Sequence, residues 1–299
     1  MKRFIKKFAL LAITLVILDL LIGAVLKYYY FKQKSGLLYR STYAIDSTRA
    51  AVLVFGSSRA NHHYVPSVFE NKLHATFYNC GRDGCNLLYD LAVISAVLER
   101  YKPQHIIIDV MPDEFSRSEE GQLSYLLPYH DNPSINHFIK YNSKFESYKL
   151  LSRMYPYNSL LTNIIVGNLS SHKSYSIDDK GYIKLDNVMP FYPKTISQQA
   201  KINVNLVRIL NDVLITLSRK HIPVTFVISP SYFLFAKEND NVEIIENLCR
   251  MYNNVDFFNY ENDTAFAAYG LYYDDLHLNY IGANKFSENL SDKLLRIEN

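Results

Sequence analysis

The chain has 299 residues, of which 48% are hydrophobic and 20% charged, and its formal net charge is +3. This composition excludes a disordered protein, and the length accommodates one large or two small domains with a sizeable core. The net charge is small, and no compact stripe of Lys and Arg occurs beyond residue 7, so nucleic acid is not a predicted partner.

The N-terminus predicts a membrane anchor. Residues 1–7 carry four positive charges, and residues 8–26 are mostly apolar, close to the roughly 20 residues that a helix needs to cross a bilayer. We predict an uncleaved, single-pass signal anchor over residues 1–30, with the rest of the chain on the extracytoplasmic (periplasmic or outer) side; a cleaved signal peptide is the alternative. Asp19 interrupts the apolar run, and contact with a partner helix is one interpretation of it.

After a predicted linker at residues 31–48, strands alternate with helices. The predicted strands are residues 51–55, 75–78, 105–110, 223–229 and 255–258, and the predicted helices are residues 66–73, 85–101, 198–220, 242–252 and 280–297. This alternation predicts an α/β fold with a doubly wound, five-stranded parallel sheet, a flavodoxin-like three-layer sandwich built from residues 49–110 and 197–299.

Between residues 111 and 196 the alternation stops, and tyrosines and prolines become frequent. A segment of this length is not expected to be a structureless loop in a compact domain. We predict an inserted, cap-like subdomain over the sheet. Ordinary packing is the favoured role for its aromatic side chains, and stacking on a sugar is the alternative.

The three cysteines do not form a disulfide framework. Cys80 and Cys85 either pair in an oxidising compartment or are small buried thiols. Since neither a CxxC nor an HExxH motif occurs, we predict no metal site and no cofactor.

Polar residues follow several of the predicted strands. The first strand leads into residues 56–59 (Gly-Ser-Ser-Arg) and the second into residues 79–84 (Asn-Cys-Gly-Arg-Asp-Gly), while residues 274–277 (Asp-Asp-Leu-His) precede the final helix. Ligands of open α/β sheets bind outside the carboxyl ends of the strands. A hydroxyl, glycine amides and an Asp-x-x-His at that edge are the parts of a nucleophile with its base, its orienting acid and an oxyanion site.

This set of motifs resembles the SGNH (GDSL-like) hydrolase family, which has Gly-Asp-Ser after the first strand, a glycine after the second and Asp-x-x-His before the last helix. The resemblance covers about residues 50–110 and 220–297. It implies a catalytic triad and an oxyanion glycine, which would be Ser58, His277, Asp274 and Gly84. Two alternatives stay open: Ser57, which stands in the family's aspartate position, as the hydroxyl, and Asp275 as the orienting acid.

The family's third block supplies an asparagine as a second oxyanion donor. Its nearest match here is Asp113, and an ionised carboxylate cannot donate a hydrogen bond to an oxyanion. In this departure the chain resembles the membrane-anchored branches of the family that act in cell-envelope acylation, such as the D-alanyl-lipoteichoic acid and alginate O-acetylation proteins. Beside the nucleophile, Arg59 is a candidate contact for an acidic substrate or a surface residue. For His62 and His63 we favour exposure to solvent, and lining the site is the alternative.

The resemblance implies a serine esterase or acyltransferase that acts on acyl, and specifically acetyl, esters of cell-envelope glycans. Its substrate would be an acylated carbohydrate or another ester, and a membrane acylation protein is a candidate partner. The alternative is a catalytically degenerate domain that binds glycan or organises such a complex. A dinucleotide-binding domain is disfavoured because the first turn lacks G-x-G-x-x-G.

Overall fold

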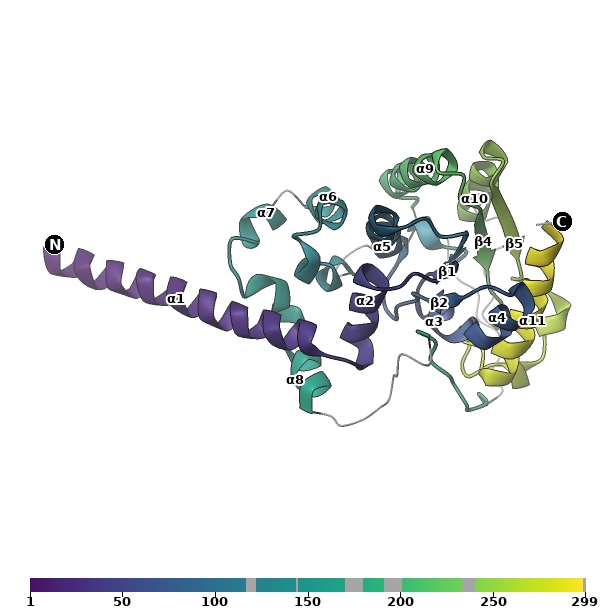
Figure 1. Cartoon of the computed structure of the whole chain (residues 1–299), viewed down its shortest axis with the longest axis horizontal. Coiled ribbons are helices and arrows are strands. Elements are labelled where there is room, and N and C mark those ends of the chain that lie inside the picture. The colour runs from purple at the N-terminus through teal and green to yellow at the C-terminus, as the bar shows by residue number, and fades with distance from the viewer. Residues whose placement is uncertain (117–121, 144, 170–179, 191–200, 233–239, 298–299) are drawn as a thin grey trace.

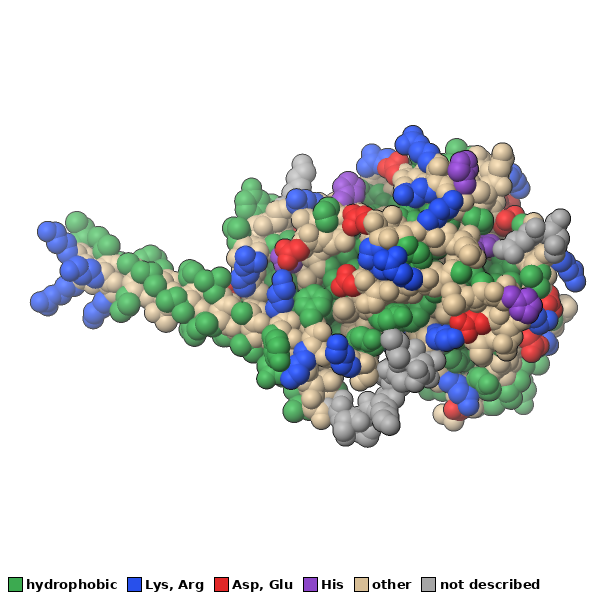
Figure 2. All heavy atoms as spheres, viewed as in Figure 1, with side chains coloured by type: hydrophobic (Ala, Val, Ile, Leu, Met, Phe, Trp, Pro, Cys, Tyr) green, Lys and Arg blue, Asp and Glu red, His purple; other side chains and the backbone are tan. Residues whose placement is uncertain are grey.

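The computed structural model describes residues 1–116, 122–143, 145–169, 180–190, 201–232 and 240–297. Helix α1 (Lys2–Lys32) projects from the body of the molecule (Figure 1). Among the described residues it is the one helix long and apolar enough to cross a membrane. Figure 2 shows hydrophobic side chains along α1 and Lys and Arg side chains at its free end, which agrees with the charge pattern of an anchor.

Five parallel strands form one sheet in the order β2-β1-β3-β4-β5. They are β1 (Val52–Phe55), β2 (Phe77–Asn79), β3 (His105–Asp109), β4 (Val224–Ile228) and β5 (Val255–Asn259). The predicted five-stranded parallel sheet is therefore confirmed. The order changes direction between β1 and β3, and open α/β sheets bind ligands outside the carboxyl ends of the strands at such a switch point.

Helices cover both faces of the sheet. The helices around it are α3 (Ser58–His63), α4 (Pro66–Leu73), α5 (Leu87–Arg100), α9 (Val204–Arg219), α10 (Asp240–Met251) and α11 (Tyr280–Ile297). Alternate strand residues enter two separate cores: Leu53 and Ile106 pack with α5, α9 and α10, whereas Val54 and Ile107 pack with α4 and α11. Strands β1 to β4 are buried on both faces, as in other doubly wound sheets, whereas the edge strand β5 is partly exposed.

The predicted linker at residues 31–48 is wrong for most of its length. Helix α2 (Gly36–Asp46) occupies it, and its Leu38 and Ile45 are each 1% exposed in the same core as α5. A helix of 11 residues is too short to be stable alone, and α5 supplies the surface that covers its apolar side chains. Packing against a neighbour, rather than helix propensity, stabilises such a helix.

Between β3 and α9 the described chain consists of short helices. They are η1 (Glu114–Ser116), η2 (Gln122–Tyr125), η3 (Leu127–Tyr129), α6 (Pro133–Asn142), α7 (Glu146–Lys149), η4 (Tyr155–Leu160) and α8 (Leu161–Leu169). We call the described part of residues 111–190 the insert. Ile135 and Phe138 of α6 join the core of α5, so the insert packs beside the sheet domain. The domain boundaries predicted from sequence stay a prediction, and residues 191–200 lie outside the described residues.

A further part of the insert, residues 180–190, runs along the β2 edge. The Asn79 amide donates to the Lys180 carbonyl at 2.8 Å, and the Ile183 amide donates to the Asn61 carbonyl at 3.1 Å. After β5, the 3₁₀ helices η6 (Thr264–Phe266) and η7 (Tyr269–Leu271) lead to the loop that precedes α11. Segments from distant parts of the chain therefore surround the start of α3.

Candidate active site

Ser58 lies at the start of α3, just beyond the carboxyl end of β1. Gly56 makes this tight turn possible: its φ is +143°, and a Cβ there would lie 2.7 Å from the Asp109 carbonyl oxygen. A side chain at residue 56 would therefore be strained and would clash with β3. Ser57 is the N-cap of α3, yet its side chain makes no capping hydrogen bond. Since Ser58 follows the cap, capping does not explain its hydroxyl.

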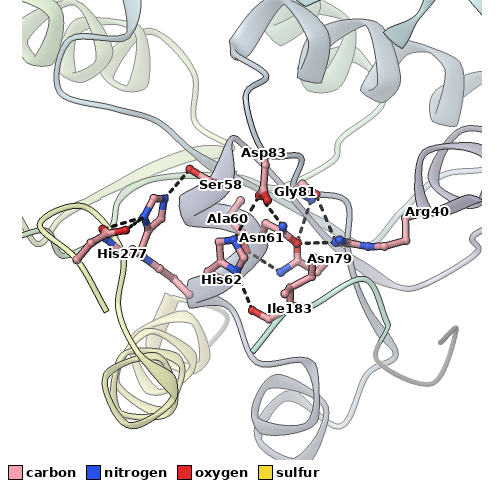
Figure 3. A network of polar contacts seen from close by, with 12 residues as sticks. Arg40, Ser58, Ala60, Asn61, His62, Asn79, Gly81, Asp83, Ile183 and His277 are labelled. Carbon is pink, nitrogen blue, oxygen red and sulfur yellow. Dashed lines mark hydrogen bonds and ion pairs between the residues drawn. The ribbon is translucent and has the colours of Figure 1, made fainter. Parts of the chain in front are cut away.

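The structure brings Ser58 and His277 together (Figure 3), and Asp274 lies beside His277. The Ser58 Oγ lies 2.7 Å from His277 Nε2, and His277 Nδ1 lies 2.9 Å from both carboxylate oxygens of Asp274. His277 and Asp274 belong to the loop before α11, and His277 is 219 positions from Ser58 in sequence. This is the geometry of a nucleophile, a base and an orienting acid.

The proton positions of this triad follow from the charge of Asp274. Burial raises the pKa of Asp274. The hydrogen bond and charge of His277, together with two backbone amides, lower this pKa by more than burial raises it, so it lies below its usual value. An ionised carboxylate only accepts, and therefore Nδ1 of His277 carries the proton. In the neutral imidazole, Nε2 is then the atom that accepts the proton of the Ser58 hydroxyl. The amides of Leu276 and His277 also donate to Asp274 Oδ1, at 2.9 and 2.8 Å, which fixes the carboxylate.

The two alternatives left open by the sequence are placed differently. The carbonyl of Asp275 accepts the Tyr232 amide at 2.9 Å, and the described contacts of His277 Nδ1 are with Asp274. Among the described residues, the hydroxyl in contact with His277 Nε2 is that of Ser58 and not that of Ser57. The geometry thus favours Ser58 over Ser57 as the hydroxyl and Asp274 over Asp275 as the orienting acid.

Gly84, the predicted oxyanion glycine, lies in a turn after β2. The Cys85 amide donates to the Arg82 carbonyl across this turn at 3.2 Å, and Gly84 has a φ of +72°. The glycine packed against the helix of Ser58 is instead Gly81, where a Cβ would lie 2.4 Å from the Asn61 amide nitrogen. The Gly81 amide donates to the Asn79 side chain at 2.9 Å and is engaged. The assignment of Gly84 as the oxyanion donor stays a prediction, and Gly81 packs against α3.

Asp113, which takes the place of the family's asparagine, precedes η1. Its Oδ1 is buried, and the described residues give it no hydrogen-bond partner. Within the part of the chain that the structure describes, no hydrogen bond or ion pair joins Asp113 to the triad. Its assignment to the oxyanion region stays a prediction.

Arg59 is not at the surface, so the predicted surface role is wrong, and its position does not suit a substrate contact. It is 1% exposed, and its Nε and Nη2 donate to Asp109 Oδ1 at 3.1 Å each. Nη2 also donates to the Val110 carbonyl at 2.7 Å. A buried guanidinium requires such partners, and here they join α3 to the end of β3. Arg59 thus holds the helix that carries Ser58.

His62 is also buried rather than solvent-facing, being 7% exposed. Its Nδ1 lies 2.8 Å from the Ile183 carbonyl and its Nε2 3.4 Å from Asp83 (Figure 3). Burial raises the pKa of Asp83, but the bond and charge of His62, with the bond from Asn61, lower it to about 2. An ionised carboxylate therefore lies beside the imidazole.

The same carboxylate belongs to a chain of polar contacts across the start of α3. Arg40 of α2 donates to Asn61 Oδ1 at 2.6 Å, and Asn61 Nδ2 donates to Asp83 at 2.5 Å. The ring of His62 lies 5.6 Å from that of His277, centroid to centroid. Sequence reasoning missed this network. The adjacent polar residues at positions 61–63 were a signal, but their partners come from α2, from the turn after β2 and from residue 183.

His63 supports the loop that carries the triad's histidine. It is fully buried, and the Leu278 amide donates to its Nε2 at 2.9 Å. Because Nε2 accepts, the proton sits on Nδ1 and is donated to Ser229 Oγ, 2.9 Å away. Burial, with the charge of Arg59, holds the pKa of His63 well below its usual value. His63 is therefore a neutral support of the residue next to His277.

This support makes stability depend on pH. The unfolded chain protonates His63 below about pH 6.5, whereas the folded chain does not, so the free energy of unfolding should fall as the pH drops below that value. The slope from this group should approach about 1.4 kcal/mol per pH unit and vanish above about pH 7. Chemical denaturation of the full chain in detergent between about pH 5 and 8 measures it. His63→Gln should reduce the slope, whereas His137→Gln at an exposed site should not; equal slopes in both variants would contradict this assignment.

The cysteines are thiols, and the alternative of a Cys80–Cys85 disulfide is wrong. All three are free, and Cys80 and Cys85 are buried. Burial raises the pKa of both thiols, so neither is activated as a nucleophile. Within the described ranges, no group of three or more His, Cys, Asp or Glu side chains is placed to hold a metal ion.

Comparisons with known proteins add a structural similarity only. No family model and no curated protein matches the sequence. Among solved structures, this chain is similar to a protein from Streptococcus pneumoniae that is provisionally named a platelet activating factor. The two are 11% identical with a TM-score of 0.44, and the alignment covers 97% of this chain and 99% of that chain. A similarity at this level carries no argument about activity, so the function must be argued from the site itself.

Proposed function

We propose that this protein is a serine esterase or acyltransferase with Ser58, His277 and Asp274 as its triad. The observation that carries the proposal is the continuous contact from Ser58 Oγ through His277 to Asp274, at 2.7 and 2.9 Å. The three side chains come from two separate segments at the carboxyl edge of a parallel sheet. The site is only partly buried, with His277 19% exposed, so an ester can approach it.

In the proposed reaction His277 Nε2 takes the Ser58 proton as Oγ attacks the carbonyl carbon of an ester. Asp274 holds the imidazole in the required tautomer and stabilises the imidazolium that forms. The backbone amides of Ser58 and Gly84 would donate to the oxyanion of the tetrahedral intermediate. His277 then protonates the leaving alcohol, and the acyl group on Ser58 passes to water or to a second hydroxyl.

The proposed substrate is an acyl ester, and specifically an acetyl ester, of a cell-envelope glycan. The resemblance of the motifs to membrane-anchored SGNH proteins supports this choice, as does the apolar helix α1 next to a triad-bearing domain. A membrane acylation protein is the proposed partner. The proposal further places α1 across the cytoplasmic membrane as an uncleaved anchor with the domain outside.

This topology predicts the result of reporter fusions. A reporter fused after residue 48, where α2 has ended, should be active if it functions outside the cytoplasm and inactive if it functions inside. Replacing Lys2, Arg3, Lys6 and Lys7 by Asn should weaken this orientation, because cations before the span keep the N-terminus inside. Activity of a cytoplasmic reporter on the unaltered anchor would contradict the topology.

Covalent labelling tests the triad. The full chain in detergent should react with a serine-directed fluorophosphonate, and peptide mapping should locate the adduct on Ser58. Ser57→Ala should label normally, and Ser58→Ala should not label. An adduct elsewhere, or equal labelling of Ser58→Ala, would remove the basis of the proposal. Faster release of the acyl group with a glycan acceptor than with water would identify a transferase.

The second candidate function is a degenerate domain that binds glycan or organises an acylation complex. The observation favouring it is Asp113, a carboxylate in the place of the family's oxyanion amide, with a buried Oδ1. Under this alternative the unaltered chain neither labels nor turns over esters, yet still retains a glycan. Asp113→Asn discriminates further, since it should raise esterase activity only if residue 113 lies at the oxyanion.

A further inference from the structure

Asp19 is bound by the insert. Its carboxylate accepts hydrogen bonds from the Ser152 hydroxyl at 2.5 Å and from the backbone amides of Arg153 and Met154 at 2.8 and 3.2 Å. These donors are 133 to 135 positions away in sequence. A partner helix is therefore unnecessary to explain a carboxylate in an apolar helix, because three donors of the same chain satisfy it.

The contact between α1 and the insert is close and continues toward the domain. A Cβ at Gly23 would lie 2.5 Å from the Arg153 backbone, so only glycine allows this approach. Further along the same helix, Tyr30 is 1% exposed. The centroid of its ring lies 5.9 Å from that of Tyr129 and 5.8 Å from that of Tyr157. The second half of α1 is thus docked onto the insert, whereas the first half projects alone (Figure 1).

The docked half overlaps the predicted membrane span. Crossing the hydrocarbon core takes roughly 20 helical residues, so a span that begins after Lys7 ends near Lys27. Asp19 lies eight residues before Lys27, which corresponds to about 12 Å along a helix. If α1 spans the bilayer, the insert residues bound to Asp19 lie below the surface of the leaflet on the domain side.

The insert carries apolar side chains that suit this depth. We define the membrane tip as residues 145–165, which include α7, η4 and the start of α8. Five of its large hydrophobic side chains are exposed: Phe145 (72%), Tyr148 (71%), Leu151 (80%), Leu161 (45%) and Ile165 (48%). An exposed apolar group of this kind on a soluble surface would favour aggregation, and beside a membrane helix it matches the acyl chains.

The polar groups of the membrane tip are compatible with that position. Lys149 is bonded to Glu146 at 2.6 Å, and the Tyr155 hydroxyl donates to the other oxygen of Glu146 at 2.6 Å. Long cationic side chains such as Lys149 and Arg153 can extend to the headgroups while their stems lie among apolar groups. A cavity of about 220 Å³ between α1 and the insert, lined in part by Leu20 and Leu150, extends the apolar surface.

We propose that the membrane tip is immersed in the domain-side leaflet, with the residues bound to Asp19 among the acyl chains, so that the protein is held by α1 and by this second attachment. The proposal rests on α1 spanning the membrane but is independent of the triad. Its occupant is lipid, because the tip continues the lipid-facing surface of α1 at the same depth. The second attachment would fix the height and orientation of the domain above the bilayer.

The chain contains no tryptophan, so single-tryptophan variants report depth directly. We would place the full chain in lipid nanodiscs with and without bromine-labelled acyl chains and compare the variants Leu151→Trp and Tyr148→Trp. Leu15→Trp in the undocked half of α1 is the positive control, and Met251→Trp, 66% exposed at the end of α10, is the negative control. Melting temperatures show whether each variant is folded.

Quenching of Leu151→Trp and Tyr148→Trp comparable to that of Leu15→Trp, with Met251→Trp unaffected, is the expected result. If Leu15→Trp is quenched while both tip variants behave like Met251→Trp, the proposal is overturned and the membrane anchor is retained. Blue-shifted emission without quenching at the tip would also overturn it, since a protein partner would then cover the surface. Absence of quenching in Leu15→Trp would show that α1 does not span the bilayer and would overturn the proposal as well. Fluorophosphonate labelling tests the triad independently of this result.

Discussion

Ser58→Ala is expected to abolish turnover of a short-chain acyl ester, with a loss in kcat on the order of 10⁶-fold, because the triad acts as a unit. The hydroxyl contributes one hydrogen bond, to His277 at 2.7 Å, and it does not cap α3. Its removal should therefore cost only about 1 kcal/mol of stability. Ester hydrolysis and thermal unfolding of the full chain in detergent measure the two effects.

Matched variants separate the triad from its surroundings. His277→Ala should resemble Ser58→Ala, and the double variant should lose no more than either single one. Asp274→Asn should lose about 10⁴-fold, because it favours the wrong imidazole tautomer. Ser57→Ala should retain most of the activity. An active Ser58→Ala variant, or losses in the double variant that multiply, would contradict the assignment of these residues to one catalytic unit.

Arg59→Met is expected to have the largest effect on stability, about 3–5 kcal/mol, because it leaves the Asp109 carboxylate buried without its cation. Both side chains are 1% exposed, and Asp109 also accepts the Tyr64 hydroxyl at 2.7 Å. Chemical denaturation in detergent measures the loss. The same variant should reduce labelling of Ser58, since the ion pair positions α3 against β3.

A double variant and a surface pair provide the controls. Arg59→Met combined with Asp109→Asn should recover part of the stability, because it removes the uncompensated charge and keeps an acceptor for Tyr64. Lys72→Met breaks the exposed pair with Asp292, whose side chains are 42% and 49% exposed, and should cost at most about 1 kcal/mol. A loss in Arg59→Met no larger than that in Lys72→Met would show that the buried pair is not a determinant of this fold.

The amino-acid sequence by itself determined the order of strands and helices and the residues that follow the strands. Residues 66–73 and 280–297 were predicted as helices with the observed bounds, and the first strand was predicted within one residue of β1. These predictions succeed because apolar periodicity, glycine and proline act on near neighbours. The Asp-x-x-His spacing likewise acts locally, since Asp274 contacts His277 within one short loop.

Only the tertiary structure decided which side chains are buried and what they bind. The local sequence around Arg59, His62 and His63 is polar, which favours exposure to solvent. The structure buries these side chains against Asp109, residue 183 and Ser229, which are 50 to 166 positions away in sequence. Helix α2 is buried because α5 packs against it. Asp19 can lie within an apolar helix because a donor 133 positions away in sequence binds its carboxylate. The physical reason is the same in each case: a polar or charged group is buried only when packing supplies its partners, and such partners come from segments that no local pattern connects.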